Sequence, residues 1–196
     1  TRGAIRTLHI LDSIGADHIG TYDSKDSFER FYPFITSIKG IRIAFLNYTY
    51  GTNGFTPHSP LIVNYIDEEK IKKDIFRAKT LSADLIVACL HWGDEYQLLP
   101  NKRQEDLADF LAKEGVQLII GAHPHVIQPM ELRYHVQGNP CALIVYSLGN
   151  FISNMKTRDT VGGAMVKVVI RRDITGKILL QSCLLYTSPS PRDRSV

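Results

Sequence analysis

Residues 84–91 read DLIVACLH and residues 116–125 read VQLIIGAHPH, and these two stretches decide the fold. Each begins with a nearly continuous apolar run of strand length, which is typical of a strand that is covered on both faces. A third such run, at residues 142–146, leads into the loop SLGN at 147–150. A helical pattern lies between the first two runs. Strands that alternate with helices predict an α/β layered fold.

The segments around these runs fit the same plan. Asp67 is a helix cap, and the periodicity predicts a helix from there to about Ser82 with Ile71, Ile75 and Ala78 on one face. A second helix is expected over 104–114, with Leu107, Phe110 and Leu111 inward and Gly115 as its stop. The other expected elements are a helix over 3–14, a short strand and turn over 18–20, strands over 41–48 and 61–66, and a hairpin of 164–170 with 176–180.

Composition narrows the class of protein. A chain of 196 residues with a hydrophobic fraction of 44% is long enough and apolar enough for one globular domain. The net charge of +3 is too small and too evenly spread to indicate a nucleic-acid partner. The cysteines have neither paired nor metal-type spacing, and no apolar stretch approaches the roughly 20 residues of a membrane span.

Both ends of the chain differ from an ordinary domain boundary. Residues 184–196 (LLYTSPSPRDRSV) lose all periodicity, which predicts a disordered tail, and the string also resembles the translation of a sequencing adapter. We therefore expect one domain over 1–183 followed by a non-native tail. The chain opens at Thr1 without Met and inside a helical pattern, so we expect a longer parent protein whose start could carry a signal or an anchor.

The strongest chemical signal is GAHPH at residues 121–125. In extended backbone, His123 and His125 would point the same way, and Pro124 would stiffen the loop. Neutral histidine is the commonest metal ligand, so the pair can serve one or two adjacent ions. For an isolated pair, simple hydrogen bonding in a loop is the better interpretation. After a buried strand and a glycine, with another histidine at an equivalent edge, the pattern favours metal ligation.

His91 is that third histidine, and WGDEY at residues 92–96 follows it directly. Gly93 permits a sharp turn that returns Glu95 to the same edge. Glu95 either orients a histidine through a hydrogen bond or acts as a general base. The rest of the loop is interpreted as structural: an exposed carboxylate for Asp94, and rim packing for Trp92 and Tyr96.

Asn150 places an amide beside the same edge, after the third apolar run. It can bind a substrate oxygen or support a ligand, and a turn-forming asparagine is the alternative. Asn47 and the loop at 48–54 raise the same question. The sequence lacks the motifs of other common active sites: it has no GxSxG elbow of a serine hydrolase, no nucleotide-binding P-loop and no dinucleotide-binding GxGxxG after a strand.

Three motifs in order, HWGDEY at 91–96, GAHPHVIQP at 121–129 and YSLGNFI at 146–152, resemble the hallmark motifs of the bacterial capsule synthesis (CapA-type) proteins. The resemblance covers residues 1–183, including NYTYGTNG at 47–54. It implies a calcineurin-like metallophosphoesterase fold, an α-β-β-α sandwich of two packed sheets flanked by helices with a two-metal centre at the strand ends. Family members are named for the synthesis and export of poly-γ-glutamate capsules.

The resemblance also implies a ligand set. His91 matches the isolated histidine ligand, His123 and His125 match the pair of the GxHxH motif, and Glu95 and Asn150 match characteristic positions to which we assign catalytic roles. The family's Gly-Asp strand end and Asn-Asn-His-x-x-Asp segment do not occur, so their carboxylates would lie before residue 1. We therefore expect two divalent transition ions (Mn, Fe or Zn) in the full-length protein, an incomplete sandwich in this chain, and no activity of the chain alone.

Two functions remain open. The first is a metal-dependent phosphoesterase-type hydrolase involved in capsule synthesis. The second is a non-catalytic surface subunit that binds an anionic capsule polymer. The expected partners are that polymer or a phosphoester, together with membrane subunits of capsule synthesis, and the family suggests a cell-surface, membrane-associated or secreted location. A third alternative is a metal-free α/β domain.

Overall fold

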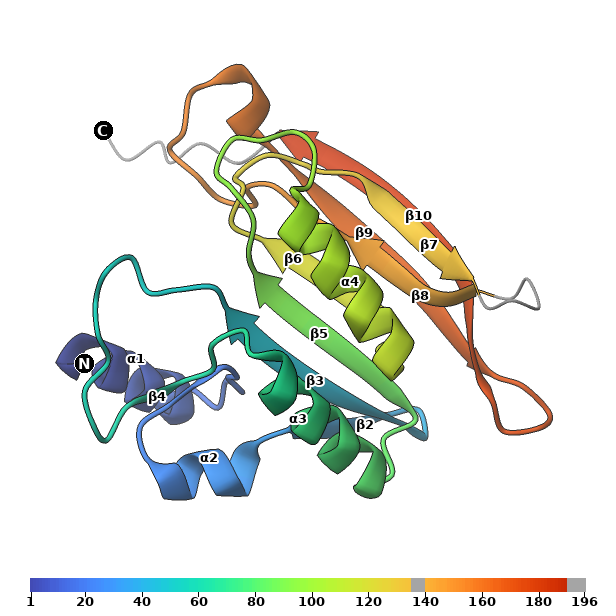
Figure 1. Cartoon of the computed structure of the whole chain (residues 1–196), viewed down its shortest axis with the longest axis horizontal. Coiled ribbons are helices and arrows are strands. Elements are labelled where there is room, and N and C mark those ends of the chain that lie inside the picture. The colour runs from blue at the N-terminus through green and yellow to red at the C-terminus, as the bar shows by residue number, and fades with distance from the viewer. Residues whose placement is uncertain (135–139, 190–196) are drawn as a thin grey trace. The chain divides into compact units, whose positions relative to one another are not determined.

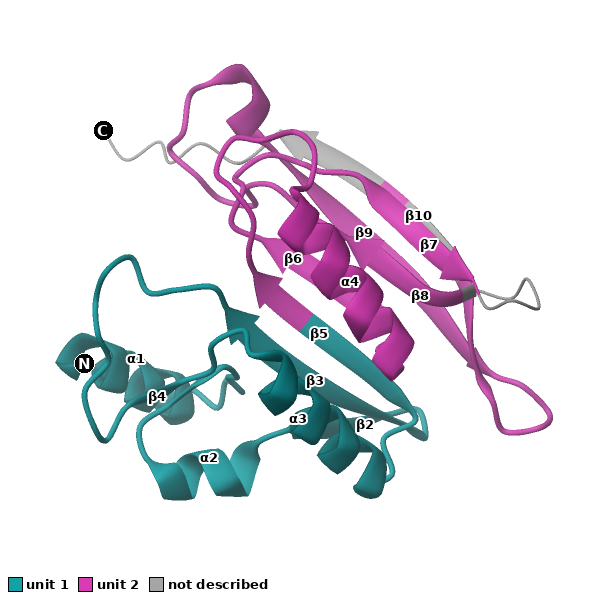
Figure 2. Cartoon of the chain, in the orientation of Figure 1, with its two compact units in different colours: residues 1–88 teal, residues 89–196 magenta. Residues whose placement is uncertain are grey.

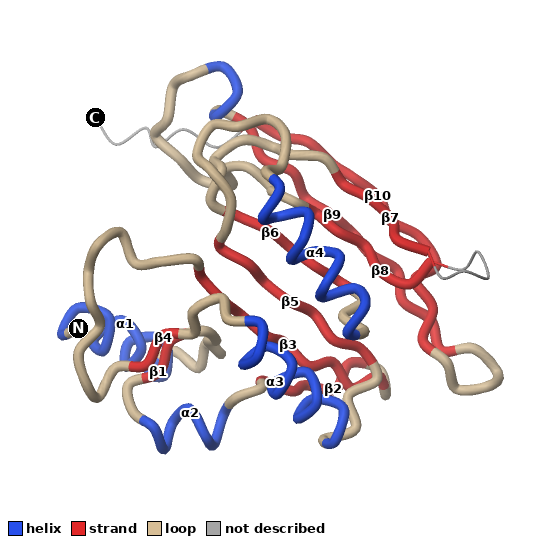
Figure 3. The backbone as a smooth tube through the Cα atoms, in the orientation of Figure 1, coloured by secondary structure: helices blue, strands red, loops and turns tan. Residues whose placement is uncertain are grey.

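The computed structural model describes residues 1–134 and 140–189, and Figure 1 shows its helices and strands in chain order. The chain forms two compact units, residues 1–88 and residues 89–196 (Figure 2). Strand β5 (Leu85–His91) begins in the first unit and ends in the second. Both units contain helices and strands (Figure 3), which is the mixed α/β fold that the alternating pattern predicts.

The first unit places its three helices around two pairs of strands. Strands β2 (Phe34–Ile38) and β3 (Ile41–Thr49) form an antiparallel hairpin, in which the connecting Lys39 and Gly40 have φ angles of 50° and 79°. Positive φ at both positions is the signature of a tight two-residue hairpin turn. The other elements are α1 (Arg2–Ser13), α2 (Lys25–Phe31), α3 (Glu68–Thr80) and the antiparallel pair of β1 (Thr21–Tyr22) with β4 (Ile62–Val63).

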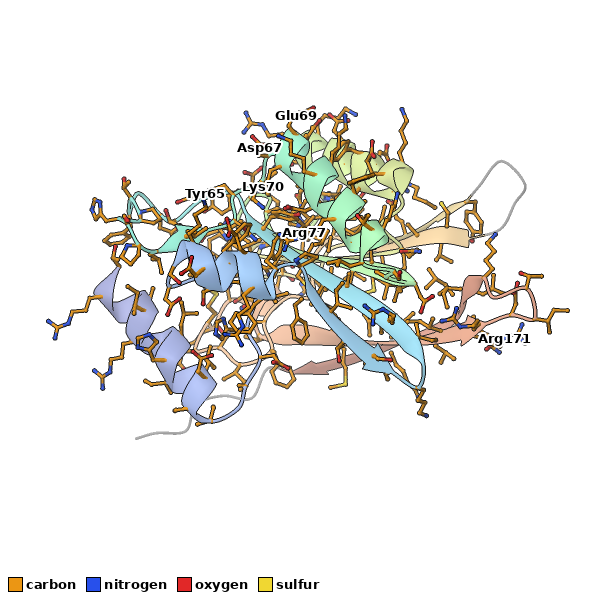
Figure 4. All side chains as sticks on the ribbon, turned by 90° about the horizontal axis from the view of Figure 1, so that it is seen from below. Tyr65, Asp67, Glu69, Lys70, Arg77 and Arg171 are labelled. Atoms are coloured by element: carbon orange, nitrogen blue, oxygen red, sulfur yellow. The ribbon has the colours of Figure 1, made fainter. Side chains whose placement is uncertain are left out.

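Helix α3 begins where the sequence predicts. The Asp67 side chain accepts a hydrogen bond from the Lys70 backbone N–H at 2.7 Å, which caps the helix. The predicted inward face is buried, with Ile71 and Ala78 fully inaccessible and Ile75 2% exposed. Asp67 and Lys70 lie close together near the start of this helix (Figure 4).

A largely buried polar cluster joins α3 to strand β3 and to the end of α2. One oxygen of Asp74, Oδ2, accepts hydrogen bonds from the hydroxyls of Tyr32 at 3.0 Å and Tyr48 at 2.8 Å, and from the Lys70 ammonium at 2.5 Å. The Lys70 ammonium also lies 4.8 Å from the centre of the Tyr32 ring. Burial raises the pKa of Tyr48 well above its usual value, and the Asp74 charge acts in the same direction. The tyrosines therefore stay protonated and keep donating to the carboxylate.

The second unit sets the register of the strands that carry the histidine motif. Strand β6 (Leu118–Ala122) pairs in parallel with β8 (Pro140–Val145), with Ile119 opposite Ile144. Parallel pairing brings the carboxyl ends of both strands to the same edge. The remaining elements of the unit are α4 (Lys102–Glu114), β7 (Met130–Tyr134) antiparallel to β8, the 3₁₀ turn η1 (Arg158–Thr160), and the antiparallel pair of β9 (Gly162–Arg172) with β10 (Ile178–Pro189).

Helix α4 covers the strands of this second unit. Leu107 and Leu111 on the helix and Ile119 and Ile144 on the strands are all buried, so they form one core. The helix ends at Gly115, whose φ of 96° is the left-handed conformation that the predicted glycine stop requires. Within residues 1–134 and 140–189, no helix has both the length and the apolar character needed to cross a membrane.

Several segments differ from the sequence prediction, and α2, β2 and β7 were not expected at all. The short strand and turn expected at 18–20 is displaced: the strand forms at Thr21–Tyr22, and Gly20 just before it has a φ of 92°, a left-handed value that glycine adopts readily. The sequence assigns 184–196 to a disordered tail, but β10 continues to Pro189 because the eleven-residue strand β9 offers backbone partners as far as Gly162. Residues 190–196 lie outside the described part. The second sheet of the expected sandwich is represented by the β9–β10 pair.

Candidate functional site

Three histidines gather where strands of the second unit end. His91 is the last residue of β5, and His123 follows β6 directly. The Trp92 N–H donates to the Ala122 carbonyl at 3.1 Å, which ties the two strand ends together. As a result, the His91 and His123 rings lie 4.5 Å apart between centroids. The two side chains therefore meet at the carboxyl ends of neighbouring strands, where α/β sheets usually bind their ligands.

A close backbone approach under the site requires glycine at position 121. A Cβ there would lie 2.0 Å from the Tyr146 carbonyl oxygen and 2.3 Å from the Trp92 indole nitrogen. The indole N–H donates to that same carbonyl at 2.9 Å. Trp92 is only 2% exposed, so the predicted rim position is wrong. Its N–H finds a buried acceptor, which lets the whole ring enter the core.

The backbone of the GAHPH loop differs from the predicted extended form. His123 has a φ of 111° and His125 a φ of 62°, which are uncommon values for residues with a side chain. The Pro124 carbonyl between them accepts the Tyr96 N–H at 2.8 Å, and this contact with a distant loop helps to fix the twist. The two rings consequently lie 6.2 Å apart with planes inclined by 53°, rather than side by side. Strained backbone of this kind clusters at functional sites.

Asn150 fixes the protonation of His125. Its Nδ2 donates to the Thr160 carbonyl at 2.9 Å, so its Oδ1 is the atom that faces His125 Nδ1, at 2.9 Å. An amide oxygen only accepts, so Nδ1 carries the proton. Neutral His125 then has its lone pair on Nε2. This is the arrangement by which a neighbouring group prepares a histidine to bind a metal.

Glu95 lies on the Nε2 side of the same ring. Its Oε1 is 3.9 Å from His125 Nε2, beyond hydrogen-bond distance, and its side chain is 48% exposed. The Tyr96 ring stacks on His125 with centroids 6.0 Å apart and planes inclined by 23°. Glu95 is therefore near the site but does not orient His125 by direct hydrogen bonding. Tyr96 belongs to the site, although the sequence alone indicated only rim packing.

The loop that carries Glu95 is held by residues on either side of it. Gly93 has a φ of 85°, and a Cβ on it would lie 2.5 Å from Gln104 Oε1. Buried Gln104 completes a capping box with Asn101 at the start of α4 and donates to Gln128 Oε1 at 2.9 Å. Gln128 donates in turn to the backbone carbonyls of residues 97 and 99. The predicted sharp turn at Gly93 is therefore present, and exposed Asp94 accepts from the Asn101 amide at 2.7 Å.

Two of the histidines, His91 and His123, are biased toward their neutral forms. Partial burial lowers the pKa of His91, and the neighbouring His123 and His125 lower it further. Partial burial also lowers the pKa of His123, against the opposing effect of Glu95. Neutral imidazole is the form that binds a metal ion. The environment of these two rings thus suits ligation at neutral pH.

The donor set fits a transition ion by chemical type, although it is not closed around one. Imidazole nitrogens suit Mn, Fe and Zn sites. Within the ranges that the structure describes, however, no three His, Cys, Asp or Glu side chains are arranged so that they could hold an ion. The site consists of imidazoles with the Glu95 carboxylate nearby, and Asp94 also acts electrostatically on His123. Asn47, the other asparagine considered from the sequence, lies in the first unit against Gly20, where a Cβ would be 2.2 Å from its Oδ1.

Comparisons with known proteins agree with the motifs. Residues 1–155 match the family described as Bacterial capsule synthesis protein PGA_cap. The chain is 30% identical over 179 residues to the PGA biosynthesis protein CapA of Bacillus subtilis (strain 168), covering 85% of this chain and 41% of that relative. This chain therefore spans less than half the length of that relative.

Comparison with solved structures identifies proteins of similar fold. A putative 5'-nucleotidase from Staphylococcus aureus matches with a TM-score of 0.54 at 17% identity, over 90% of this chain and 33% of that one. The calcineurin-like phosphoesterase YfkN from Bacillus subtilis matches with a TM-score of 0.50 at 15% identity, over 89% and 57%. The fold is therefore phosphoesterase-like.

Proposed function

The chain belongs to the bacterial capsule synthesis protein family, and from this premise we propose that it forms the histidine side of a metal-dependent phosphoesterase-type site that serves capsule synthesis. One observation carries the proposal: His91, His123 and His125 converge from two strand ends, and partial burial lowers the pKa of His91 and His123. The phosphoesterase-like fold supports the same chemistry by analogy.

In this proposal the three histidines hold a divalent transition ion, Mn, Fe or Zn, through ring nitrogens. When bound, such an ion supplies a Lewis acid and lowers the pKa of water at the site. Asn150 is a positioning residue, because its Oδ1 holds the proton on His125 Nδ1 and leaves Nε2 free to donate its lone pair. Glu95 is exposed beside that nitrogen and takes up the proton of the attacking water.

The whole protein has more of the site than these residues. Imidazoles alone leave the charge of a divalent ion uncompensated, whereas two-metal phosphoesterase sites use carboxylates to bridge the ions. The chain spans 41% of the length of the CapA relative, so we propose that the parent supplies these carboxylates and a second ion from its further sequence. We also propose a poly-γ-glutamate type of capsule, in line with "PGA" in the name of that relative, and a cell-surface location, which a role in capsule synthesis suggests.

A second function is favoured by a specific observation. Among the described residues, no three ligand side chains are arranged to hold an ion. A surface subunit that only binds an anionic capsule polymer would not need such an arrangement. In that case the histidine cluster would contribute to binding or stability, and membrane subunits of capsule synthesis would be its partners.

Metal binding by the purified chain tests the first function. Equilibrium dialysis against Mn²⁺ and Zn²⁺, followed by elemental analysis, should give about one ion per wild-type chain and a much lower content for His123→Ala. His58→Ala is the matched control, because His58 is an exposed histidine of the first unit to which neither sequence nor structure gives a role. Equal metal content in all three proteins would refute the histidine site. Hydrolysis of p-nitrophenyl phosphate by a chain extended to the length of its relatives, lost in His123→Ala, would then distinguish the enzyme from the binding subunit.

A further inference from the structure

A pocket lies beside the histidine cluster, wholly within the second unit. Its volume is about 380 Å³, and it is lined by Tyr96 and Val126 on the side of the site and by segment 155–160 on the other. A cavity of this size holds one small chemical unit. The pocket is separate from the rings of His91 and His123, which do not line it.

Two residues connect the pocket to the candidate site. Tyr96 lines the pocket and stacks on His125. Met155 also lines it, and its sulfur accepts a weak hydrogen bond at 3.4 Å from the Asn150 amide that positions His125. A molecule reacting at the histidines would therefore have its neighbouring portion next to this pocket.

The walls of the pocket combine apolar and charged groups. Val126, Met155 and the Tyr96 ring provide apolar surface, and the hydroxyls of Thr157 and Thr160 pair with each other at 2.7 Å. Lys156 and Asp159 are both exposed. Within the described residues, no ion pair occupies either charge. The lining of the pocket thus provides one cation, one carboxylate acceptor and apolar surface.

We propose that this pocket is the recognition subsite for the part of the substrate that adjoins the reacting bond. It takes a short apolar stem that carries an anionic oxygen group and a neighbouring N–H or O–H donor. Lys156 binds the anion, Asp159 accepts from the donor, and the Tyr96 ring packs against the stem. The inference rests on the proposed function for the position of the reacting bond, whereas binding in the pocket does not require the metal.

The anion can be a carboxylate of an acidic peptide-like polymer or the phosphate of a phosphorylated sugar. Both groups satisfy a lysine ammonium. The acidic polymer offers an amide N–H beside its carboxylate, and the sugar phosphate offers a hydroxyl. Two probes distinguish these sources: a triglutamate peptide and glucose 6-phosphate.

The test measures the dissociation constant of each probe by calorimetry for the wild-type chain and for two charge reversals. Lys156→Glu removes the attraction and adds repulsion, so the affinity for the anionic probe should fall about tenfold. Lys167→Glu makes the same charge change at an exposed position on β9 outside the pocket, and it should change the affinity less than about twofold. Tyr96→Ala should weaken probe binding at both low and high salt, because salt does not screen the contact between the Tyr96 ring and the stem. The effect of Lys156→Glu should shrink at high salt.

The outcomes identify the source of the anion or overturn the subsite. Weakening confined to the peptide identifies a carboxylate source, and weakening confined to the sugar phosphate identifies a phosphate source. Wild-type protein that binds neither probe, or equal losses in Lys156→Glu and Lys167→Glu, would overturn the subsite. His123→Ala should retain probe binding in metal-free buffer. Suppose that wild type and His123→Ala both take up no metal in the dialysis against Mn²⁺ and Zn²⁺, while Lys156→Glu still weakens probe binding. The metal site is then refuted and the subsite is supported.

Discussion

Gly121 should be the position at which a single methyl group does most damage to the site. In Gly121→Ala, the new Cβ would lie 2.0 Å from the Tyr146 carbonyl oxygen and 2.3 Å from the Trp92 indole nitrogen. Real contacts of this kind do not fall below 3.0 Å, so the strand ends would have to separate by about 1 Å, taking the shorter contact from 2.0 to 3.0 Å. Neither neighbour can yield easily, because one is backbone and the other is a fully packed ring.

The cost can be estimated from these contacts. Overpacking of a well-packed core costs about 1–3 kcal/mol. The bond from the Trp92 N–H to the Tyr146 carbonyl would also break, which adds about 1 kcal/mol. We therefore expect Gly121→Ala to lose about 2–4 kcal/mol, which corresponds to roughly 5–15 °C in Tm for a chain of this size. His123 follows two residues later, so metal binding should weaken as well.

The assay is urea unfolding followed by tryptophan fluorescence. Trp92 is the only tryptophan in the sequence, so the signal reports on the packing in question. The native emission of the variant should already move to longer wavelength, because the indole loses its tight surroundings. Gly51→Ala is the control, since a Cβ on Gly51 meets nothing within 4 Å. An unfolding midpoint and native emission that match the wild type in Gly121→Ala would refute the close-approach reasoning.

Three further outcomes are expected. Asn150→Leu should weaken metal binding by about 10- to 100-fold in dialysis, because nothing then holds the proton on His125 Nδ1; an unchanged affinity would remove Asn150 from the site. Asp74→Ala should destabilise the chain by about 2–4 kcal/mol in urea unfolding, since two buried tyrosine hydroxyls and the partly exposed Lys70 ammonium lose their acceptor, and a loss below 1 kcal/mol would contradict the buried cluster. Burial raises the pKa of Cys89, so less thiolate exists at pH 8 and alkylation by iodoacetamide, followed by mass spectrometry, should be slow until the chain unfolds; rapid native labelling would argue against burial.

Local signals made helices α1, α3 and α4 predictable, whereas α2 was not expected from the sequence. Helix α3 has a capping aspartate and apolar residues at helical spacing, and α4 has a glycine at its end, so both could be placed from sequence with ends that differ by a few residues. The same holds for strands β5 and β6, whose apolar runs are continuous. These features depend on neighbours in sequence, which is why pattern alone finds them.

Elements that depend on distant partners were harder to predict. Strand β2 is half-exposed and has no strong periodicity, and it is defined by its pairing with β3. Strand β10 extends into residues whose composition indicates disorder, because β9 supplies backbone partners for them. A strand's boundary is set by what lies beside it, and the sequence of one strand does not contain that information.

The candidate site shows the same division. That His91 and His123 would meet followed from the order of strands and loops. The left-handed backbone of His125 and the inward position of Trp92 did not, because each depends on a hydrogen bond to a residue far away in sequence. Tyr96 was likewise missed as part of the site. A tyrosine beside a loop histidine has no distinguishing pattern until the ring stacking is visible.

The frame around Gly93 has a consequence for how this family can diversify. The loop from residue 93 to 101 is anchored by Gln104 and Gln128, through bonds that involve neither the Glu95 nor the Tyr96 side chain. These two side chains can therefore be exchanged while the scaffold that presents them persists. Substitution of these two side chains should therefore cost little in folding. The shape of the loop and the chemistry of its exposed side chains thus depend on different residues.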